Sequence, residues 1–241
     1  MKFFMKKVIL IFMKLFNQNL KVDLKSEISP NTYKNMNGKK NQKIIIKNSV
    51  IGGSVCLGHK VFLKDVICSG KIKIGNHVSI TGPATRISGW DEGVQIGSYT
   101  SIASNVVIQE EMHRMDKVST YLMNKNLFNN NIKNQKDTYT KGKIIIEEDV
   151  WIGSNSVILS GVTVGRGSVI GAGTIVSKSI PRYSIVVGNP ARVIKKRFND
   201  EIIWKLEEME WWNYPVEKIQ QNQAFFTDIL TSHISENIKG L

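Results

Sequence analysis

The strongest constraint on this chain is a run of six consecutive hexapeptides between residues 146 and 181. The run reads IEEDVW, IGSNSV, ILSGVT, VGRGSV, IGAGTI and VSKSIP, with isoleucine or valine at every first position. Repetition of one template at a fixed short period is typical of a solenoid. The same template occurs earlier as IGGSVC (51–56), LGHKVF (57–62), IGNHVS (74–79), IGSYTS (96–101) and IASNVV (102–107).

A period of six residues predicts a short strand followed by a sharp turn. An amphipathic helix would need apolar residues three and four positions apart, and these segments lack that spacing. Three units close a triangular coil of about 18 residues, and coils stack about 4.8 Å apart. The aliphatic positions fill the interior, and glycines allow the turns. We therefore predict an all-β solenoid, a parallel β-helix.

Two regions depart from the repeat. Residues 109–145 form a polar insertion rich in Asn and Lys, and an excursion of this length is typical of a functional loop or a disordered segment. Further on, FNDEIIWKLEEMEWW predicts a helix from near Asn199, and Pro215 starts a second helical segment, so we expect a helical cap on the final coil. The predicted organisation is a basic leader (1–42), a β-helix domain (43–195) and a C-terminal helical extension (196–241).

Positive charge is concentrated at the N-terminal end. Residues 1–50 hold eleven lysines and only two acids, Asp23 and Glu27, so +9 of the formal net charge of +13 lies there. A nucleic-acid-binding face would carry aromatic or groove-reading residues among its cations, and the pattern lacks them. The distribution favours an anionic lipid surface or an anionic glycan as the partner, and not nucleic acid.

The first sixteen residues, MKFFMKKVILIFMKLF, combine lysines with apolar side chains. The apolar run from Val8 to Met13 is too short to span a bilayer, and no small-residue cleavage site follows it. As a helix, the segment would carry lysines on one side and apolar residues on the other, which is typical of a helix in a membrane interface. Docking on the protein itself or on a neighbouring subunit is the alternative.

The two cysteines, Cys56 and Cys68, make no disulfide framework and are expected to be reduced thiols. We therefore expect a cytoplasmic protein, with peripheral contact to the inner face of the membrane as the further option that residues 1–16 leave open.

Three segments resemble the xenobiotic acetyltransferase family within the hexapeptide-repeat acyltransferase superfamily. They are MHRMD followed by STY (112–121), the run from DVWIGS to VIKKRF (149–198), and KLEEMEWWNYPVEKI (205–219). The resemblance implies a left-handed coil, acetyl-CoA as the acetyl donor, chloramphenicol- or streptogramin-type acceptors, and a homotrimer with active sites between subunits. However, ISGWDEGVQIG (87–97) looks more like acetyltransferases of bacterial surface polysaccharides, and residues 1–95 add coils that drug-modifying members generally lack.

Acetyl transfer from a thioester to a hydroxyl needs a base, an oxyanion donor and a groove for the pantetheine arm of CoA. His59 and His77 fall on outward turns of their hexapeptides, and His233 lies in the tail, so we expect surface roles for them. His113 stands where the regular coil ends and the insertion begins. The resemblance makes it the general base, since a histidine is partly neutral at cellular pH; a surface loop histidine is the alternative.

The resemblance, extended to maltose and galactoside acetyltransferases, also implies the residues that bind CoA. They are Trp151 beside the site, Ser154 and Ala172 along the pantetheine arm, and Ser177, Lys178, Arg192 and Lys195 near the nucleotide and its phosphates. The cations have independent support, because Lys and Arg bind phosphates by charge-assisted hydrogen bonds. Their alternative is a solvated basic terminus. The oxyanion donor is expected to be a backbone N–H.

For the acceptor, the candidates are Trp90, Asp91 and Tyr121, because a tryptophan face stacks on sugars and a carboxylate binds hydroxyls. A turn tryptophan that covers the coil is the alternative. We expect no metal, since the γ-type carbonic anhydrases use three zinc-binding histidines on this helix, and the histidines at 59, 77 and 113 lack that arrangement.

The sequence therefore favours an acetyl-CoA-dependent O-acetyltransferase acting on a bacterial surface polysaccharide or its precursor. A xenobiotic acetyltransferase that inactivates antibiotics is the main alternative. Small-molecule acceptors such as serine or nucleotide sugars, and a non-enzymatic β-helix scaffold, are the others.

Overall fold

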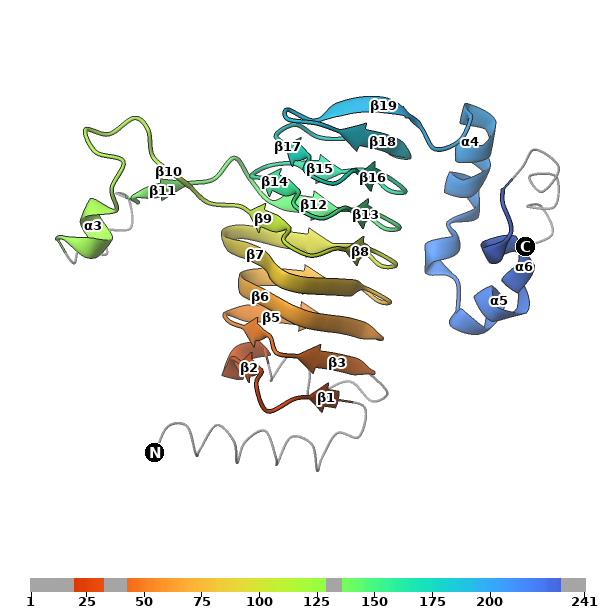
Figure 1. Cartoon of the computed structure of the whole chain (residues 1–241), viewed down its shortest axis with the longest axis horizontal. Helices are drawn as coiled ribbons and strands as arrows, with labels where there is room; N and C mark the ends of the chain where they lie inside the picture. The colour runs from red at the N-terminus through yellow and green to blue at the C-terminus, as the bar shows by residue number, and fades with distance from the viewer. Residues whose placement is uncertain (1–19, 33–42, 129–135, 231–241) are drawn as a thin grey trace.

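The computed structural model describes residues 20–32, 43–128 and 136–230 of the 241-residue chain. Nearly all of its strands belong to one sheet that winds in successive coils around a single axis (Figure 1). Ile152 pairs with Ile170, and Ile158 pairs with Val176, so one coil takes 18 residues, as the hexapeptide period predicts. The predicted fold class, a left-handed parallel β-helix with a long inserted loop and a helical C-terminal region, is confirmed.

The coils present three faces, each built from strands stacked in parallel. Face A holds β1 (Leu20–Val22), β3 (Ile44–Lys47), the starts of β6 (Val61–Ile74) and β7 (Ser79–Ile96), β8 (Ser101–Ile102), β13 (Trp151–Ile152), β16 (Val169–Ile170) and β18 (Ser184–Val187). Face B holds β2 (Glu27–Ile28), β4 (Val50–Ile51), the middles of β6 and β7, β9 (Val107–Gln109), β14 (Val157–Leu159) and β17 (Ile175–Val176). Face C holds β5 (Ser54–Leu57), the ends of β6 and β7, β12 (Ile144–Ile146) and β15 (Thr163–Val164).

The turns between these faces form three ridges, which we name corners AB, BC and CA after the faces they join. The remaining strands lie outside the three faces: β19 (Arg192–Lys196) runs antiparallel to β18 at the C-terminal end, and β10 (Met112–His113) pairs antiparallel with β11 (Thr138–Tyr139) in the insertion. The helices are α3 (Met123–Asn126) in the insertion, and α4 (Asp200–Met209), the 3-10 turn η1 (Trp211–Asn213), α5 (Val216–Gln221) and α6 (Gln223–Thr227) in the C-terminal region.

The first positions of the hexapeptides fill the axis of the coils, as predicted. Ile152, Ile158, Val164, Ile170 and Val176 are all completely buried, and Ile170 and Val176 stack on Ile152 and Ile158 one coil further on. Each such side chain stabilises the stack by roughly 1.5–3 kcal/mol. The side chains next to these positions point outward, and two of the candidate functional residues, Trp151 and Ser177, are among them.

The stack begins earlier than position 43. Leu20 and Val22 in β1 are buried and pair with β3, and β2 pairs with β4. Part of the expected basic leader (1–42) therefore belongs to the β-helix. The membrane segment proposed for residues 1–16 lies outside the described residues. Among the helices that the structure describes, none is both long enough and apolar enough to cross a membrane.

The predicted C-terminal helices are present, and they lie along corner CA instead of across the end of the stack (Figure 1). The side chain of Asn199 caps α4 by accepting a hydrogen bond from the backbone N–H of Ile202 at 2.9 Å, which is the predicted start. At the end of the coils, it is β19 that pairs with the last strand of face A.

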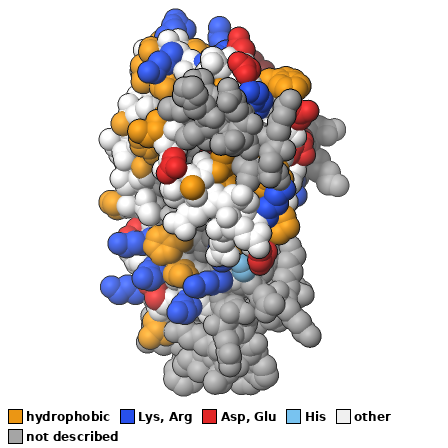
Figure 2. Space-filling model, turned by 90° about the vertical axis from the view of Figure 1, so that its right-hand side faces the viewer, with side chains coloured by type: hydrophobic (Ala, Val, Ile, Leu, Met, Phe, Trp, Pro, Cys, Tyr) orange, Lys and Arg blue, Asp and Glu red, His pale blue; other side chains and the backbone are white. Residues whose placement is uncertain are grey.

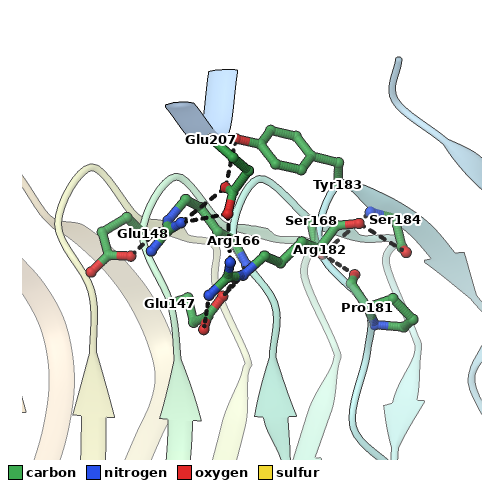
Figure 3. Close-up of polar contacts among 9 residues, drawn as sticks. All are labelled: Glu147, Glu148, Arg166, Ser168, Pro181, Arg182, Tyr183, Ser184 and Glu207. Atoms are coloured by element: carbon green, nitrogen blue, oxygen red, sulfur yellow. Dashed lines mark hydrogen bonds and ion pairs between the residues drawn. The ribbon is translucent and has the colours of Figure 1, made fainter. Parts of the chain in front are cut away.

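Glu207 of α4 fixes this position (Figure 3). Its carboxylate accepts hydrogen bonds from Arg166 at 2.9 Å, from Arg182, and from the Tyr183 hydroxyl at 3.1 Å. Arg166 also donates to Glu148 and lies 3.7 Å from the ring centroid of Trp212. Because these partners come from different coils, the helices are held along the stack and not only at its end.

His59 and His77 differ from the predicted exposed turn residues, since both are half-buried. They belong to an aromatic row on corner CA. His77 stacks on Tyr99 at 4.9 Å, and Tyr99 contacts Trp211 of η1 at 4.9 Å. Burial, with the charges of Lys60 and His59, lowers the pKa of His77. The sequence could not show this contact, because Trp211 lies more than a hundred residues further along the chain.

Candidate active site

The insertion leaves the coils at corner BC, between the end of β9 and the start of β12, and projects away from the stack (Figure 1). Its two arms form a short antiparallel ladder in which His113 pairs with Thr138. Arg114 continues the ladder, because its backbone N–H donates to the carbonyl of Asp137 at 3.2 Å. The ladder places His113 on a paired strand and not on a free loop.

The imidazole of His113 is exposed, and its Nδ1 lies 2.7 Å from the carbonyl oxygen of Thr120. A carbonyl oxygen only accepts hydrogen bonds, so the neutral ring must donate from Nδ1. The Nε2 atom then carries the lone pair. This is the tautomer that a general base needs if Nε2 is to receive a proton.

Asp137 holds the outer part of the insertion together. Its carboxylate accepts hydrogen bonds from the Asn124 side chain and from the backbone N–H of Lys125, both at 3.0 Å, and lies 3.8 Å from the ammonium of Lys117. Burial alone would raise the pKa of Asp137, but these hydrogen bonds and the lysine charge lower it on balance. An ionised Asp137 therefore ties α3 and the 117 region to β11.

A buried glutamate anchors the root of the insertion. Glu110 is fully buried, and its carboxylate accepts the backbone N–H groups of Asp91 at 3.0 Å and Glu92 at 2.5 Å. The Asp91 carboxylate in turn pairs with Lys136 at 2.7 Å. Since Lys136 lies two residues from Thr138, the partner of His113, Glu110 connects the turn at 90–92 to the strand pair that carries the imidazole.

Sequence reasoning missed Glu110. The signal was the alternation in IQEEMH, which buries Ile108, exposes Gln109 and so turns the next side chain inward. Glu111 is half-buried beside it. Burial, together with the charges of Glu110 and Asp91, raises the pKa of Glu111.

The three acceptor candidates lie on or beside the insertion. Trp90 (51% exposed) and Asp91 lie on the turn that Glu110 holds, and Tyr121 (56% exposed) follows Thr120 directly. The Asp91 carboxylate is paired with Lys136, so it positions the insertion instead of standing free for a sugar hydroxyl. Trp90 and Tyr121 keep exposed aromatic faces.

Two of the cofactor candidates lie on corner AB. The backbone N–H of Gly173 donates to the carbonyl of Ser154 at 2.8 Å, so Ser154 and the exposed Ala172 occupy equivalent turns of successive coils. The Ser154 hydroxyl also lies 3.3 Å from that of Ser104 in the coil below. The result is a ridge of small side chains that a slender pantetheine arm could follow.

The other cofactor candidates lie elsewhere. Trp151 (56% exposed) points outward from face A beside Ser101 and Val169. On β19, Arg192 pairs with Val187 near corner AB, and Lys195 pairs with Ile185. Ser177 and Lys178 are exposed at corner BC. One chain therefore spreads the cofactor candidates over two corners and face A, and it does not bring His113 to Ser154 and Ala172.

Comparison with known proteins gives three concordant similarities. A family model described as hexapeptide repeat of succinyl-transferase matches residues 143–178. A chloramphenicol acetyltransferase of Klebsiella aerogenes is 42% identical over 154 residues, which cover 61% of this chain and 68% of the relative. A putative lipopolysaccharide biosynthesis O-acetyl transferase of Escherichia coli K12 is 34% identical over 114 residues, which cover 47% of this chain and 56% of the relative.

A solved structure is similar over most of both chains. It is a mutant of AntD, an N-acyltransferase from Bacillus cereus, in complex with dTDP and coenzyme A. The identity is 25% and the TM-score is 0.54, and the match covers 76% of this chain and 96% of that chain. The two relatives and AntD are all acyltransferases by name, so the similarity concerns the class of reaction as well as the fold.

Proposed function

Because the chain belongs to the hexapeptide-repeat acetyltransferases, we propose that it transfers an acetyl group from acetyl-CoA to a hydroxyl of a bacterial surface polysaccharide or its precursor. The observation that carries the proposal is the hydrogen bond between His113 Nδ1 and the Thr120 carbonyl. It orients the imidazole of an exposed histidine with its basic nitrogen outward.

The chemistry assigned to His113 is general base catalysis. Acetyl-CoA, as the donor substrate, supplies an acetyl thioester. Nε2 of His113 takes the proton of the acceptor hydroxyl as its oxygen forms the new ester bond, and returns that proton to the sulfur as the thioester bond breaks. The Thr120 carbonyl stabilises the cation that exists between these two transfers, because it accepts from Nδ1–H in both states of the ring.

The proposed donor site follows corner AB. Ser154 and Ala172 would border the pantetheine arm, and Arg192 at the end of the same corner would bind a phosphate of the nucleotide. Lys178, Ser177, Lys195 and Trp151 are assigned to the same substrate. Since they lie on other parts of the chain, one subunit alone would not surround the donor.

A homotrimer resolves this separation. In a ring of three parallel stacks, corner BC of one subunit can approach face A and corner AB of the next. His113 would then meet a donor held by the neighbouring subunit. The insertion supports this arrangement, because it projects away from its own coils and carries the imidazole with it (Figure 1).

The proposed acceptor is a glycan, and two exposed aromatic side chains on or beside the insertion support it. Trp90 and Tyr121 offer exposed ring faces, which stack on sugars, and the E. coli relative is named for lipopolysaccharide biosynthesis. A specific observation favours a second candidate, acetylation of chloramphenicol, since the K. aerogenes relative bears that activity in its name. In either case the bond formed is an ester to a hydroxyl.

The test is acetyl-CoA turnover followed by release of free thiol, with the purified full chain. We expect turnover with an acidic surface polysaccharide and ester groups on the recovered glycan. Turnover with chloramphenicol and not with any glycan would replace the first proposal by the second. Absence of turnover with both, together with no heat of CoA binding in calorimetry, would leave a scaffold.

We further propose peripheral contact of residues 1–16 with an anionic membrane surface, on the basis of their lysines and apolar side chains. Co-sedimentation with anionic liposomes should be stronger for the full chain than for a chain that lacks these residues. Equal sedimentation would contradict the contact.

A further inference from the structure

A groove lined by three lysines and two aspartates lies on corner AB of the first coils, on a different corner from the insertion. It has a volume of about 600 Å³ and is open to solvent. The residues that line it are Asp23, Leu24, Lys25, Lys47, Asn48, Lys64 and Asp65. Lys47 and Lys64 pair in register on adjacent strands, so their side chains leave the sheet one above the other, about 4.8 Å apart at the backbone.

The two aspartates of the groove accept hydrogen bonds from neighbouring turns of the fold. Asp23 accepts the backbone N–H groups of Lys25 at 3.2 Å, Ser26 at 2.9 Å and Asn48 at 2.9 Å. Burial alone would raise the pKa of Asp23, but the Ser26 hydroxyl and these N–H groups lower it on balance, so the carboxylate is ionised. Asp65 accepts the Asn48 amide at 2.5 Å.

The lysines of the groove have no carboxylate partner among the described residues. Lys25, Lys47 and Lys64 are exposed, and within residues 20–32, 43–128 and 136–230 no ion pair joins any of them to a carboxylate. Lys21, on the adjacent β1, adds a further exposed cation. Positive side chains also gather over the N-terminal coils on the side of the molecule shown in Figure 2.

We propose that this groove binds an anionic stretch of the acceptor glycan, such as successive acidic sugars. Lysines at strand spacing suit repeated carboxylate or phosphate groups. A membrane surface fits less well, because Leu24 is the single large apolar side chain among the lining residues. A membrane-binding face needs several such side chains to enter the lipid.

The position of the groove connects it with the reaction. Corner AB continues from Asp65 through the turns at 82–84 and 103–105 to Ser154, three coils on, which is roughly 14 Å at the stacking distance. The intervening turns, Gly82–Ala84 and Ala103–Asn105, carry no charged side chain. A glycan anchored in the groove can therefore run along this ridge toward the donor edge. The inference rests on the proposed glycan acceptor.

The test is a binding titration of the full chain, without acetyl-CoA, against a fluorescent hexamer of galacturonic acid. The double variant Lys47→Gln, Lys64→Gln should weaken binding by about tenfold or more, because each ammonium that contacts a carboxylate is lost. The matched control is Lys60→Gln, Lys73→Gln, which removes the same charge from other faces of the same coils and should change binding less than about twofold. A neutral dextran hexamer should not bind.

Equal weakening by the two double variants, or equal binding of dextran, would contradict the assignment of the groove to an anionic glycan. Groove-dependent binding of phosphatidylglycerol vesicles without binding of the hexamer would also overturn it and assign the surface to lipid. The activity of the unmodified chain separates this inference from the proposed function. Groove-dependent binding without acetyl transfer to any glycan contradicts the proposed function alone, and acetyl transfer without groove-dependent binding contradicts the groove alone.

Discussion

The Nδ1 atom of His113 and the carbonyl oxygen of Thr120 lie 2.7 Å apart, within a single loop of the insertion. The partner that orients the imidazole is therefore a main-chain atom, and it stays available when side chains around it change. The loop itself is what must be kept in place. Asp137 holds the outer part of the insertion and Glu110 holds its root. The geometry of the proposed base therefore depends on residues that need not touch the acceptor.

Replacement of His113, the proposed base, should abolish most of the activity. His113→Ala should lower kcat by about 10²–10⁴-fold, because proton transfer from the acceptor hydroxyl loses its catalyst. Val118→Ala, in the same loop and fully exposed, is the control and should stay within about twofold of the unmodified chain. The measurement is acetyl-CoA turnover, with circular dichroism to show an unchanged fold. Equal rates for the two variants would remove His113 from the mechanism.

Loss of the Glu110 carboxylate should loosen the root of the insertion. Glu110→Gln leaves at least one of the N–H groups of Asp91 and Glu92 with a poorer acceptor, at a cost of about 1–3 kcal/mol in the free energy of unfolding. We expect a lower kcat as well, since the turn at 90–92 holds Lys136. Urea unfolding and turnover measure the two effects. Glu92→Gln, whose exposed side chain lies on the same turn, should change neither; a similar loss in both variants would contradict the anchoring role.

The contact between Glu147 and Arg182 predicts a pH dependence of stability. Hydrogen bonds from the Arg182 guanidinium lower the pKa of Glu147, which burial alone would raise. A lowered pKa adds stability that is complete above the ordinary value of 4.5 and is lost as the pH falls through the folded-state value. For this partly exposed pair the contribution is about 1 kcal/mol or less.

The comparison is between the unmodified chain and Glu147→Gln, by urea unfolding at several pH values. The difference in unfolding free energy should be constant near neutral pH and shrink below pH 4.5, because glutamine does not titrate. A difference that grows on acidification would show that the sign is wrong. Glu208→Gln, an exposed neighbour of Glu207 on α4, should show no such trend.

Neutral substitutions in the proposed donor site should raise the KM for acetyl-CoA. Lys178→Gln and Arg192→Gln each remove one charge-assisted contact to a phosphate, which corresponds to about three- to tenfold in KM with little change in kcat. Lys143→Gln, an exposed lysine just before β12, is the matched control. If all three variants raise KM equally, or none does, these cations have no specific contact with the nucleotide.

The fold could be predicted because its cause is local and repeated. Each hexapeptide places one aliphatic side chain inward, so the period alone predicted that Ile152, Ile158, Val164, Ile170 and Val176 are buried. Glu207 shows where this reasoning ends. Its partner Arg166 is 41 residues away, and no local pattern indicates which corner the helix will cover. His77 and Trp211 are a second case, since their shared contact with Tyr99 depends on the same placement.

The sequence names candidate residues for the site, but it does not predict how the fold places them relative to one another. The motif MHRMD makes His113 a candidate, and the family resemblance makes Ser154 and Ala172 candidates, but the sequence does not say which corner each repeat reaches. The number of residues between Gln109 and Ile144 decides where the chain re-enters the coil, and it returns in register with β7. Because of that return, His113 lies at corner BC while Ser154 and Ala172 lie on corner AB.

Separation of the base from the donor corner can be tested by mixing two inactive chains. His113→Ala lacks the base, and Ala172→Trp fills the ridge proposed for the pantetheine arm, so each chain alone should be inactive. If the site lies between subunits of a trimer, a site in a mixed trimer works when its base comes from an Ala172→Trp chain and its donor corner from a His113→Ala chain. Random assembly of equal amounts should restore about a quarter of the sites. Each variant co-assembled with itself is the control, and turnover that stays absent in the mixture while mixed trimers are shown to form would place base and donor in one subunit.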